Sequence, residues 1–239
     1  MLVSNIVRKY INKVFVPTRA DMFALQRLAA LKLSFLPTSI ASMRPAAVNL
    51  ILNDIIVNRR KTILEFGSGV STLYIAALIQ YIGEGKLISF EHDKEWMKVV
   101  EGMLNKNGLS EFVSLEYAPL VMDHPWVSKS KTSWYEAESV RKALSGVVVD
   151  LLIVDGPPAG NKPNVKNQLS RFPALPAVEP HMSSPCAIIL DDFNRLGEQK
   201  IVKSWVEDFE GFDCLDYTLT TGTAYLRRGQ GYVVTVQSR

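Results

Sequence analysis

Carboxylates stand where four apolar segments of the chain end: Glu65, Glu91, Asp155 and the pair Asp191-Asp192. A carboxylate can attract a cationic ligand, accept hydrogen bonds from hydroxyl groups, coordinate a hard metal ion or take up a proton. In open α/β sheets, ligands bind outside the carboxyl ends of the strands. The elements that precede these acids therefore decide which chemistry each acid can do.

The segment from Ile63 to Thr72 predicts a buried strand, a tight turn through Gly67 and Gly69, and the start of a helix. Such a turn presents backbone N–H groups to a ligand. Thr72 stands where a dinucleotide fingerprint has its third glycine, and Glu65 precedes the first glycine. A carboxylate about 4 Å from a phosphate oxygen costs about 4 kcal/mol at an effective dielectric constant of 20. NAD is therefore disfavoured, and no Gly-Lys-Ser/Thr follows to bind another phosphate.

S-adenosylmethionine fits this turn better than a dinucleotide. Its ammonium and sulfonium groups suit the acidic Glu65, and its carboxylate suits the amides at the helix start. The second acid, Glu91, ends the next predicted strand, near the ~20-residue offset of a ribose-binding carboxylate. Asp93 is a candidate N-cap for the helix that begins near Lys94. The alternatives are an ordinary strand–helix connection with a surface glutamate, and a solvated strand end at Glu91.

Strands and helices alternate from Lys61 onward, which predicts a doubly wound, Rossmann-like parallel α/β sheet. The expected strands are 63–66, 87–91, 112–117, 147–155 and 187–192, and two closing β segments, 214–220 and 224–236, form an antiparallel hairpin at the sheet edge. The expected helices are 71–81, 94–107, 136–144 and 198–209, with 21–33 and 46–58 in a mostly helical N-terminal extension. We therefore expect a helical cap over residues 1–60 and a binding domain over residues 61–239.

Composition excludes several classes of protein. The 239 residues carry a formal net charge of +3, which is too small and too scattered to predict nucleic-acid binding. Cys186 and Cys214 give neither a disulfide framework nor a zinc spacing, so we expect a cytoplasmic protein. No run of about 18 apolar residues predicts a transmembrane helix. Residues 6–15 can form a basic amphipathic helix, either on an anionic membrane surface or packed on the chain's own domain or on a second subunit of a homo-oligomer.

From Lys61 to the C-terminus, the chain resembles the class I S-adenosylmethionine-dependent methyltransferases. The resemblance rests on the Glu65–Gly69 turn, the strand end at Glu91, the sequence Val154-Asp155-Gly156-Pro157-Pro158 and the closing hairpin. It implies a seven-stranded sheet whose last strand is antiparallel. It also implies that the turn and the helix start hold the methionine end, that Glu91 holds the ribose, and that Tyr117 and Ala118 border the adenine. The expected donor-binding residues are Glu65, Gly67, Ser68, Gly69, Ser71, Thr72, Glu91, Tyr117 and Ala118.

Asp155 and the pair Asp191-Asp192 follow two apolar strands that are expected to be neighbours about 4.8 Å apart. They could share one Mg²⁺ or Mn²⁺ ion, which would lower the pKa of a substrate hydroxyl. Because side chains alternate along a strand, we expect only one acid of the pair to serve. The arrangement resembles the metal-dependent O-methyltransferases, although those commonly have Asp-Asn where this chain has Asp-Asp. The alternative is that these acids cap the following loops and helices.

The acceptor is expected to be a small molecule or a glycan unit. The segment from Asp191 to Glu198 is similar to the corresponding segment of plant glucuronoxylan methyltransferases, which suggests a sugar hydroxyl. Asp155 and a histidine are the candidate catalytic groups; of His124, His181 and Lys162, we prefer His124 as the general base. The sequence thus predicts an O-methyltransferase. The rival is a non-catalytic Rossmann-like subunit that binds nucleosides or partner proteins, and an NAD-dependent oxidoreductase is a more distant alternative.

Overall fold

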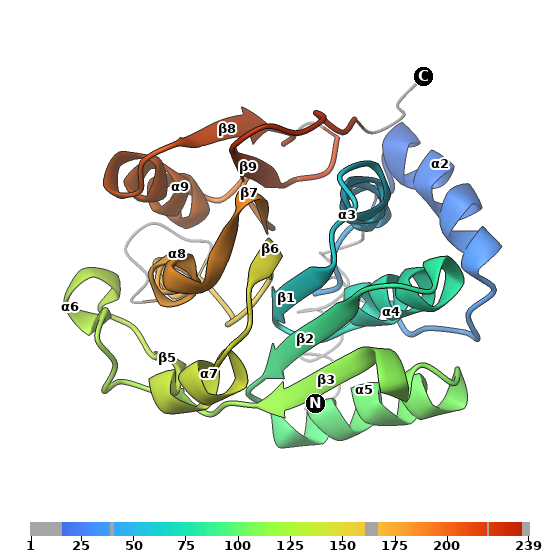
Figure 1. The fold of residues 1–239 in the computed structure, drawn as a ribbon, viewed down its shortest axis with the longest axis horizontal. Coiled ribbons are helices and arrows are strands. Elements are labelled where there is room, and N and C mark those ends of the chain that lie inside the picture. Colours follow the sequence, from blue (N-terminus) through green and yellow to red (C-terminus); the bar gives the residue numbers. More distant parts are fainter. Residues whose placement is uncertain (1–15, 39–40, 161–166, 219, 236–239) are drawn as a thin grey trace, which may run out of the picture.

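A seven-stranded sheet forms the centre of the protein (Figure 1). The computed structural model describes residues 16–38, 41–160, 167–218 and 220–235. The strand order is β3-β2-β1-β6-β7-β9-β8, with β1 (Thr62–Phe66), β2 (Lys86–Glu91), β3 (Val113–Tyr117), β6 (Val149–Val154), β7 (Met182–Leu190), β8 (Phe212–Asp216) and β9 (Ala224–Arg228). β9 is antiparallel to β7 and β8, whereas β3, β2, β1, β6 and β7 are parallel. The expected fold, including the closing antiparallel hairpin, is confirmed.

Helices cover both faces of this sheet, as Figure 1 shows. They are α2 (Arg19–Leu28), α3 (Pro45–Val57), α4 (Val70–Ile82), α5 (Lys94–Lys106), α6 (Val127–Ser130), α7 (Ala137–Ala143), α8 (Ala174–Val178) and α9 (Leu196–Asp208). Consecutive residues of β1 serve opposite faces: Ile63 packs with α3 and α4, and Leu64 packs in the core shared with α7, α8 and α9. This alternation is the reason for two apolar layers. Among the described residues, no helix combines the length and apolar character needed to cross a membrane.

The boundaries of β7, β8 and β9 differ most from the expected ones. β7 begins at Met182 rather than at residue 187, because its polar first half pairs with β6 at Val149 before the register shifts. β8 and β9 are shorter than expected, and β9 ends before Gly229, whose φ of +81° turns the chain away. The segment expected to be a loop after β3 contains a small antiparallel pair, β4 (Leu120–Val121) and β5 (Trp134–Tyr135).

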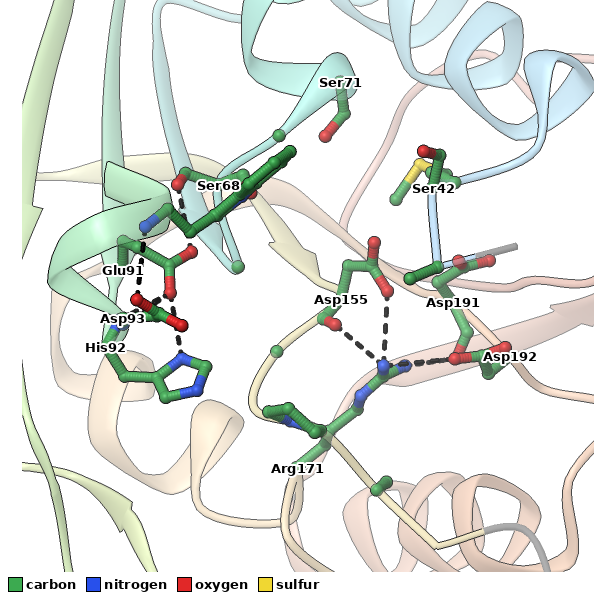
Figure 2. A pocket seen from close by; sticks show the side chains of 18 of the residues that line it. Ser42, Ser68, Ser71, Glu91, His92, Asp93, Asp155, Arg171, Asp191 and Asp192 are labelled. Carbon is green, nitrogen blue, oxygen red and sulfur yellow. Dashed lines mark hydrogen bonds and ion pairs between the residues drawn. The ribbon is translucent and has the colours of Figure 1, made fainter. Parts of the chain in front are cut away.

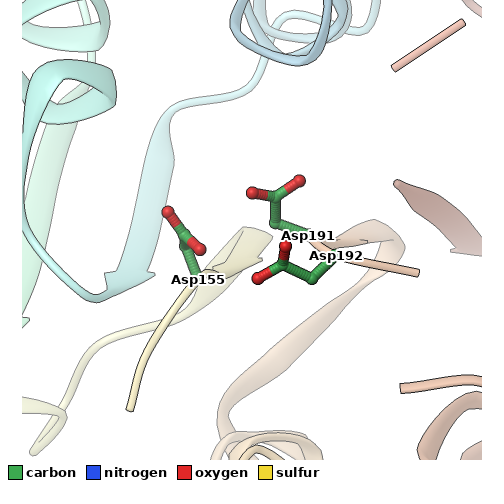
Figure 3. A group of neighbouring side chains, drawn as sticks. All are labelled: Asp155, Asp191 and Asp192. Carbon is green, nitrogen blue, oxygen red and sulfur yellow. The ribbon is translucent and has the colours of Figure 1, made fainter. Parts of the chain in front are cut away.

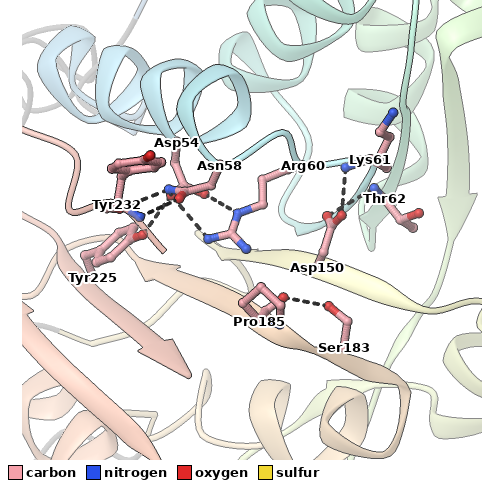
Figure 4. A network of polar contacts seen from close by, with 10 residues as sticks. All are labelled: Asp54, Asn58, Arg60, Lys61, Thr62, Asp150, Ser183, Pro185, Tyr225 and Tyr232. Atoms are coloured by element: carbon pink, nitrogen blue, oxygen red, sulfur yellow. Dashed lines mark hydrogen bonds and ion pairs between the residues drawn. The ribbon is translucent and has the colours of Figure 1, made fainter. Parts of the chain in front are cut away.

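Helix α3 is tied to the sheet by polar contacts (Figure 4). Asp54 of α3 accepts hydrogen bonds at 2.7 Å from Arg60 Nε, from Asn58 Nδ2 and from the hydroxyl of Tyr225 in β9. α3 also packs into the same apolar layer as β1 and α4. The division of the chain at residue 60 remains a prediction, and residues 6–15 lie outside the described residues.

Candidate active site

A pocket of about 480 Å³ lies at the carboxyl edge of the parallel strands. It is lined by the glycine turn after β1, the end of β2, and the residues that follow β6 and β7, with Ala41, Ser42 and Met43 ahead of α3 on its other side. Figure 2 shows Glu91 on one side of this pocket and Asp155 and Asp191 on the other. Its volume is in the range of small-molecule and cofactor sites.

The glycine turn is built by the close approach of two backbones. Gly67 has a φ of +94°, and a Cβ at this position would lie 2.9 Å from the backbone nitrogen of Gly156 in the loop after β6. Only glycine meets both conditions without strain. Ser68, Gly69 and Ser71 then line the pocket where α4 begins. The turn therefore occupies the place that the sequence predicts for the donor.

Glu65 lies beneath the glycine turn rather than at its mouth. Its carboxylate is fully buried and accepts hydrogen bonds from the hydroxyls of Ser71, Thr72 and Ser89 at 2.6, 2.5 and 2.7 Å. The Thr72 hydroxyl in turn accepts the Gly69 amide at 2.8 Å. Burial raises the pKa of Glu65, and neither Glu65 nor Thr72 is among the residues that line the pocket. Both residues shape the turn from below, so the expected direct contact between Glu65 and a cationic ligand is not what this geometry offers.

Glu91 lines the other end of the pocket as a held carboxylate. Its Oε1 accepts the amides of His92 and Asp93 at 2.7 and 2.8 Å, and its Oε2 accepts the Ser68 hydroxyl at 3.0 Å. Burial alone would raise the pKa of Glu91, but the hydrogen bonds from His92 and from the Asp93 amide outweigh it and lower that pKa. The side chain is therefore an ionised acceptor, as hydrogen bonding to ribose hydroxyls requires.

The expected adenine residues lie outside the pocket lining. Ala118 is fully buried, and the ring of Tyr117 faces Lys94 Nζ at 4.6 Å from the ring centroid. The residues that line this end are instead His92, Asp93 and Trp96, whose indole N–H donates to the Ser68 carbonyl at 2.8 Å, together with Tyr135 of β5. Tyr135 is fully buried, and its hydroxyl has no hydrogen-bond partner among the described residues.

The three aspartates after β6 and β7 come together (Figure 3). Ligand oxygens of Asp155, Asp191 and Asp192 all lie within 4.8 Å of one another. Both Asp191 and Asp192 belong to this group of carboxylates, although the alternation of side chains along a strand predicts only one of them. The reason is that β7 has already ended at Leu190 and Asp192 has a φ of +59°, which turns its side chain back toward the group.

Burial and mutual repulsion raise the pKa values of two of these acids. Burial and the neighbouring Asp191 raise the pKa of Asp155 well above its ordinary value. Burial and the charge of Asp192 raise the pKa of Asp191 to about 7. Both side chains line the pocket, so the group contains proton acceptors that titrate well above the usual range of a carboxylate.

A buried arginine already bridges part of this acidic group. Nη2 of Arg171 lies 3.2 Å from Asp155 Oδ1 and 3.1 Å from Asp192 Oδ2. Oxygen ligands suit Mg²⁺ or Mn²⁺, but here the guanidinium contacts two of the three carboxylates that the ion would use. These residues fit an internal ion pair better than a divalent cation.

Residues 64–193 match the family model described as a methyltransferase domain. The match covers more than half of the 239 residues. The chain belongs to this methyltransferase family. No curated protein matches its sequence.

Solved structures share the fold of this methyltransferase. The SAH-bound methyltransferase PaMTH1 of Podospora anserina is 14% identical over 95% of this chain and 96% of that chain, with a TM-score of 0.59. A putative caffeoyl-CoA O-methyltransferase of Staphylococcus aureus is 12% identical over 95% and 98%, with a TM-score of 0.55. An O-methyltransferase of Bacillus cereus in complex with SAH is 16% identical over 94% and 97%, with a TM-score of 0.53. The family match and the shared fold confirm the assignment to the class I S-adenosylmethionine-dependent methyltransferases.

The histidine candidates do not reach the pocket of the methyltransferase. His124 lines a separate depression beside Glu136 and Arg141; its Nε2 lies 2.8 Å from the Thr132 carbonyl, and its ring packs near Trp134. His181 immediately precedes β7 and so lies at the amino end of that strand. Lys162 lies outside the described residues. His92 lines the pocket but lies beside Glu91, with its Nδ1 2.9 Å from Glu91 Oε1. At the opposite end, the candidate proton acceptors are the aspartates.

We expect Gly67→Ala to lower the free energy of unfolding of the methyltransferase by about 2–4 kcal/mol, because it combines backbone strain with overpacking. Gly69→Ala is the matched control: its φ of 176° is extended backbone, and a Cβ there meets nothing within 4 Å. The control should stay within about 1 kcal/mol of the wild type. Urea denaturation measures the free energy of unfolding of both variants. Equal losses in the two variants would contradict the close approach of the Gly67 and Gly156 backbones.

Proposed function

We propose that the protein transfers the methyl group of S-adenosylmethionine to an oxygen atom of a small polar acceptor. In this proposal, the methionine end of the donor lies on the turn from Gly67 to Ser71, and the ribose lies on Glu91. The acceptor hydroxyl enters between the sulfonium and Asp155. The observation that carries the proposal is the continuous pocket that runs from Glu91 past the glycine turn to Asp155 and Asp191.

The proposed reaction is a direct displacement. The acceptor oxygen forms a bond to the methyl carbon, the bond from that carbon to sulfur breaks, and S-adenosylhomocysteine leaves as a neutral thioether. The hydroxyl proton passes to a carboxylate, for which we propose Asp155. Figure 2 shows one oxygen of Asp155 held by Arg171 and the other directed toward the side of the pocket where Ser71 and Ser42 lie. Alignment of oxygen, methyl and sulfur in this pocket would supply much of the rate.

The acceptor end of the pocket is polar. Asp191, Asp192 and Arg195 line it beside Ser42, and such a set can bind a molecule with several hydroxyl groups. This supports a sugar or another polyhydroxylated acceptor, and the names of the O-methyltransferases from Staphylococcus aureus and Bacillus cereus favour oxygen as the methylated atom. The two free cysteines agree with our proposal of a cytoplasmic protein, and a homo-oligomer remains part of the prediction.

Calorimetric titration with S-adenosylhomocysteine tests the donor half of the proposal, with NADH as the negative comparison. Wild-type protein should bind S-adenosylhomocysteine, and Glu91→Ala should weaken that binding by at least tenfold because the ribose loses a charged acceptor. Release of S-adenosylhomocysteine across a panel of sugars, phenols and hydroxy acids tests the acceptor half. Binding of the donor without turnover on the whole panel would favour a non-catalytic subunit, and no binding would overturn the proposal.

A further inference from the structure

Arg171 is a buried charge beside the acidic end of the site. It lies in the segment that connects β6 to α8, and only 3% of its surface is exposed. Its Nε and Nη1 donate to the carbonyls of Pro157 and Asp191 at 3.3 and 3.1 Å. Its Nη2 donates to the Asp155 carbonyl at 2.7 Å as well as contacting the carboxylates of Asp155 and Asp192. Every nitrogen of the planar group is thus engaged.

These contacts place one positive charge between the ends of two strands. Asp155 follows β6, and Asp191 and Asp192 follow β7. The carboxylates of Asp155 and Asp192 are therefore oriented by a guanidinium that belongs to the same chain, as Figure 2 shows. A second arginine, Arg195, lies 2.8 Å from Asp192 Oδ2 through its Nη1. Arg195 Nη1 also lies 3.9 Å from Oε1 of the buried Glu198. Two arginine charges then face four carboxylates, so part of the negative charge that would attract a divalent ion is already balanced.

We propose that Arg171 serves as a built-in cation: it takes the place between Asp155 and Asp192 that a divalent ion would otherwise occupy. The methyltransferase then assembles its acidic group without a metal at this position. A metal ion sharing the same two carboxylate oxygens would be repelled by the guanidinium that contacts both of them. This inference concerns ion binding alone and goes beyond the proposed function, which its failure would leave standing.

Electron paramagnetic resonance with Mn²⁺ tests the proposal on the full-length protein. Protein and Mn²⁺ are mixed at about 100 µM each, a concentration at which weak metal sites begin to fill. The wild type should leave the spectrum of free Mn²⁺ unchanged. Arg171→Gln should create one Mn²⁺ site whose Kd is at least tenfold lower than that of any Mn²⁺ binding by the wild type. The double substitution Arg171→Gln with Asp155→Asn should remove this site. Arg141→Gln, at an exposed position of α7, should behave as wild type.

Two further arms keep the test decisive if Arg171→Gln folds poorly. Arg171→Lys retains the positive charge and should remain free of Mn²⁺, and circular dichroism shows whether each variant is folded. Wild type also decides by itself: one Mn²⁺ bound per chain and lost in Asp155→Asn would overturn the proposal. Wild-type binding that Asp155→Asn leaves intact lies at another site, and the comparison of Arg171→Gln with the wild type then decides. A folded Arg171→Gln that binds Mn²⁺ no better than wild type would also overturn it.

Discussion

Asp155→Asn is expected to lower kcat by about 10²–10⁴-fold, the usual contribution of a positioned proton acceptor. The asparagine keeps the size of the side chain and can still accept a hydrogen bond from Arg171, but it cannot take up the proton of the acceptor hydroxyl. The Kd for S-adenosylhomocysteine should change less than threefold, since the proposed donor contacts come from the glycine turn and Glu91. Steady-state kinetics and calorimetry on the same preparations separate the two effects.

The pH dependence gives a second readout of the same residue. Because burial and the charge of Asp191 raise the pKa of Asp155, its basic form appears only as the pH rises through that raised pKa. The kcat of the wild type should therefore increase toward alkaline pH. Asp191→Asn removes the neighbouring charge and lowers the pKa of Asp155. The rise of kcat with pH should therefore move to lower pH. If Asp155→Asn changed kcat by less than threefold, Asp155 would be excluded as the acceptor of the proton. The same would follow if Asp191→Asn left the pH at which kcat rises unchanged.

The sequence could predict the strands and the acids at their ends because both signals are local. Short segments with several apolar residues define β1, β2 and β6, and parallel strands bring their carboxyl ends to one edge. The sequence alone was therefore sufficient to expect Glu91 and Asp155 at the same edge of the sheet. The participation of Asp192 could not be expected in this way, since it depends on a left-handed backbone conformation beyond the end of β7.

The residues that sequence reasoning missed come from segments whose path is set by tertiary packing. Tyr135 reaches the pocket because β5 pairs with β4, and two-residue strands leave no periodic signal. The sequence allows Arg171 either an acidic substrate group or a structural salt bridge, but its contacts with the carbonyls of Asp155 and Asp191 depend on the connection after β6. His124 illustrates the opposite error: its type suits catalysis, and the fold places it in another depression.

Glu65 shows how a correct position can carry an incomplete interpretation. The sequence places an acid beside the glycine turn, and the inference that it selects a cationic donor assumes that the carboxylate faces the ligand. Three hydroxyl groups instead enclose it, and its pKa is raised by burial. The preference for S-adenosylmethionine therefore depends on the family and on Glu91, whereas Glu65 fixes the shape of the turn.

Asp54→Ala is expected to lower the free energy of unfolding by about 3–5 kcal/mol, because it leaves Arg60 as a buried charge without its partner. Asp54 has no exposed surface, Arg60 is 5% exposed, and the hydroxyl of Tyr225 also loses its acceptor. Tyr225→Phe removes only one neutral donor and should cost about 1 kcal/mol. Asp213→Ala, at an exposed position of β8, is the control for loss of an acid and should stay within about 0.5 kcal/mol of the wild type.

The shape of the unfolding transition tests whether residues before Lys61 form a unit of their own. α3 contributes buried side chains to the layer between the sheet and α4, and Asp54 connects it to β9 on the far side of that layer. We therefore expect one cooperative transition, with far-ultraviolet circular dichroism and tryptophan fluorescence coincident in the wild type and in Asp54→Ala. Separate transitions would mean that the N-terminal helices unfold independently. A single transition would mean that the wall formed by Ala41, Ser42 and Met43 is as stable as the sheet, because α3 begins two residues after Met43.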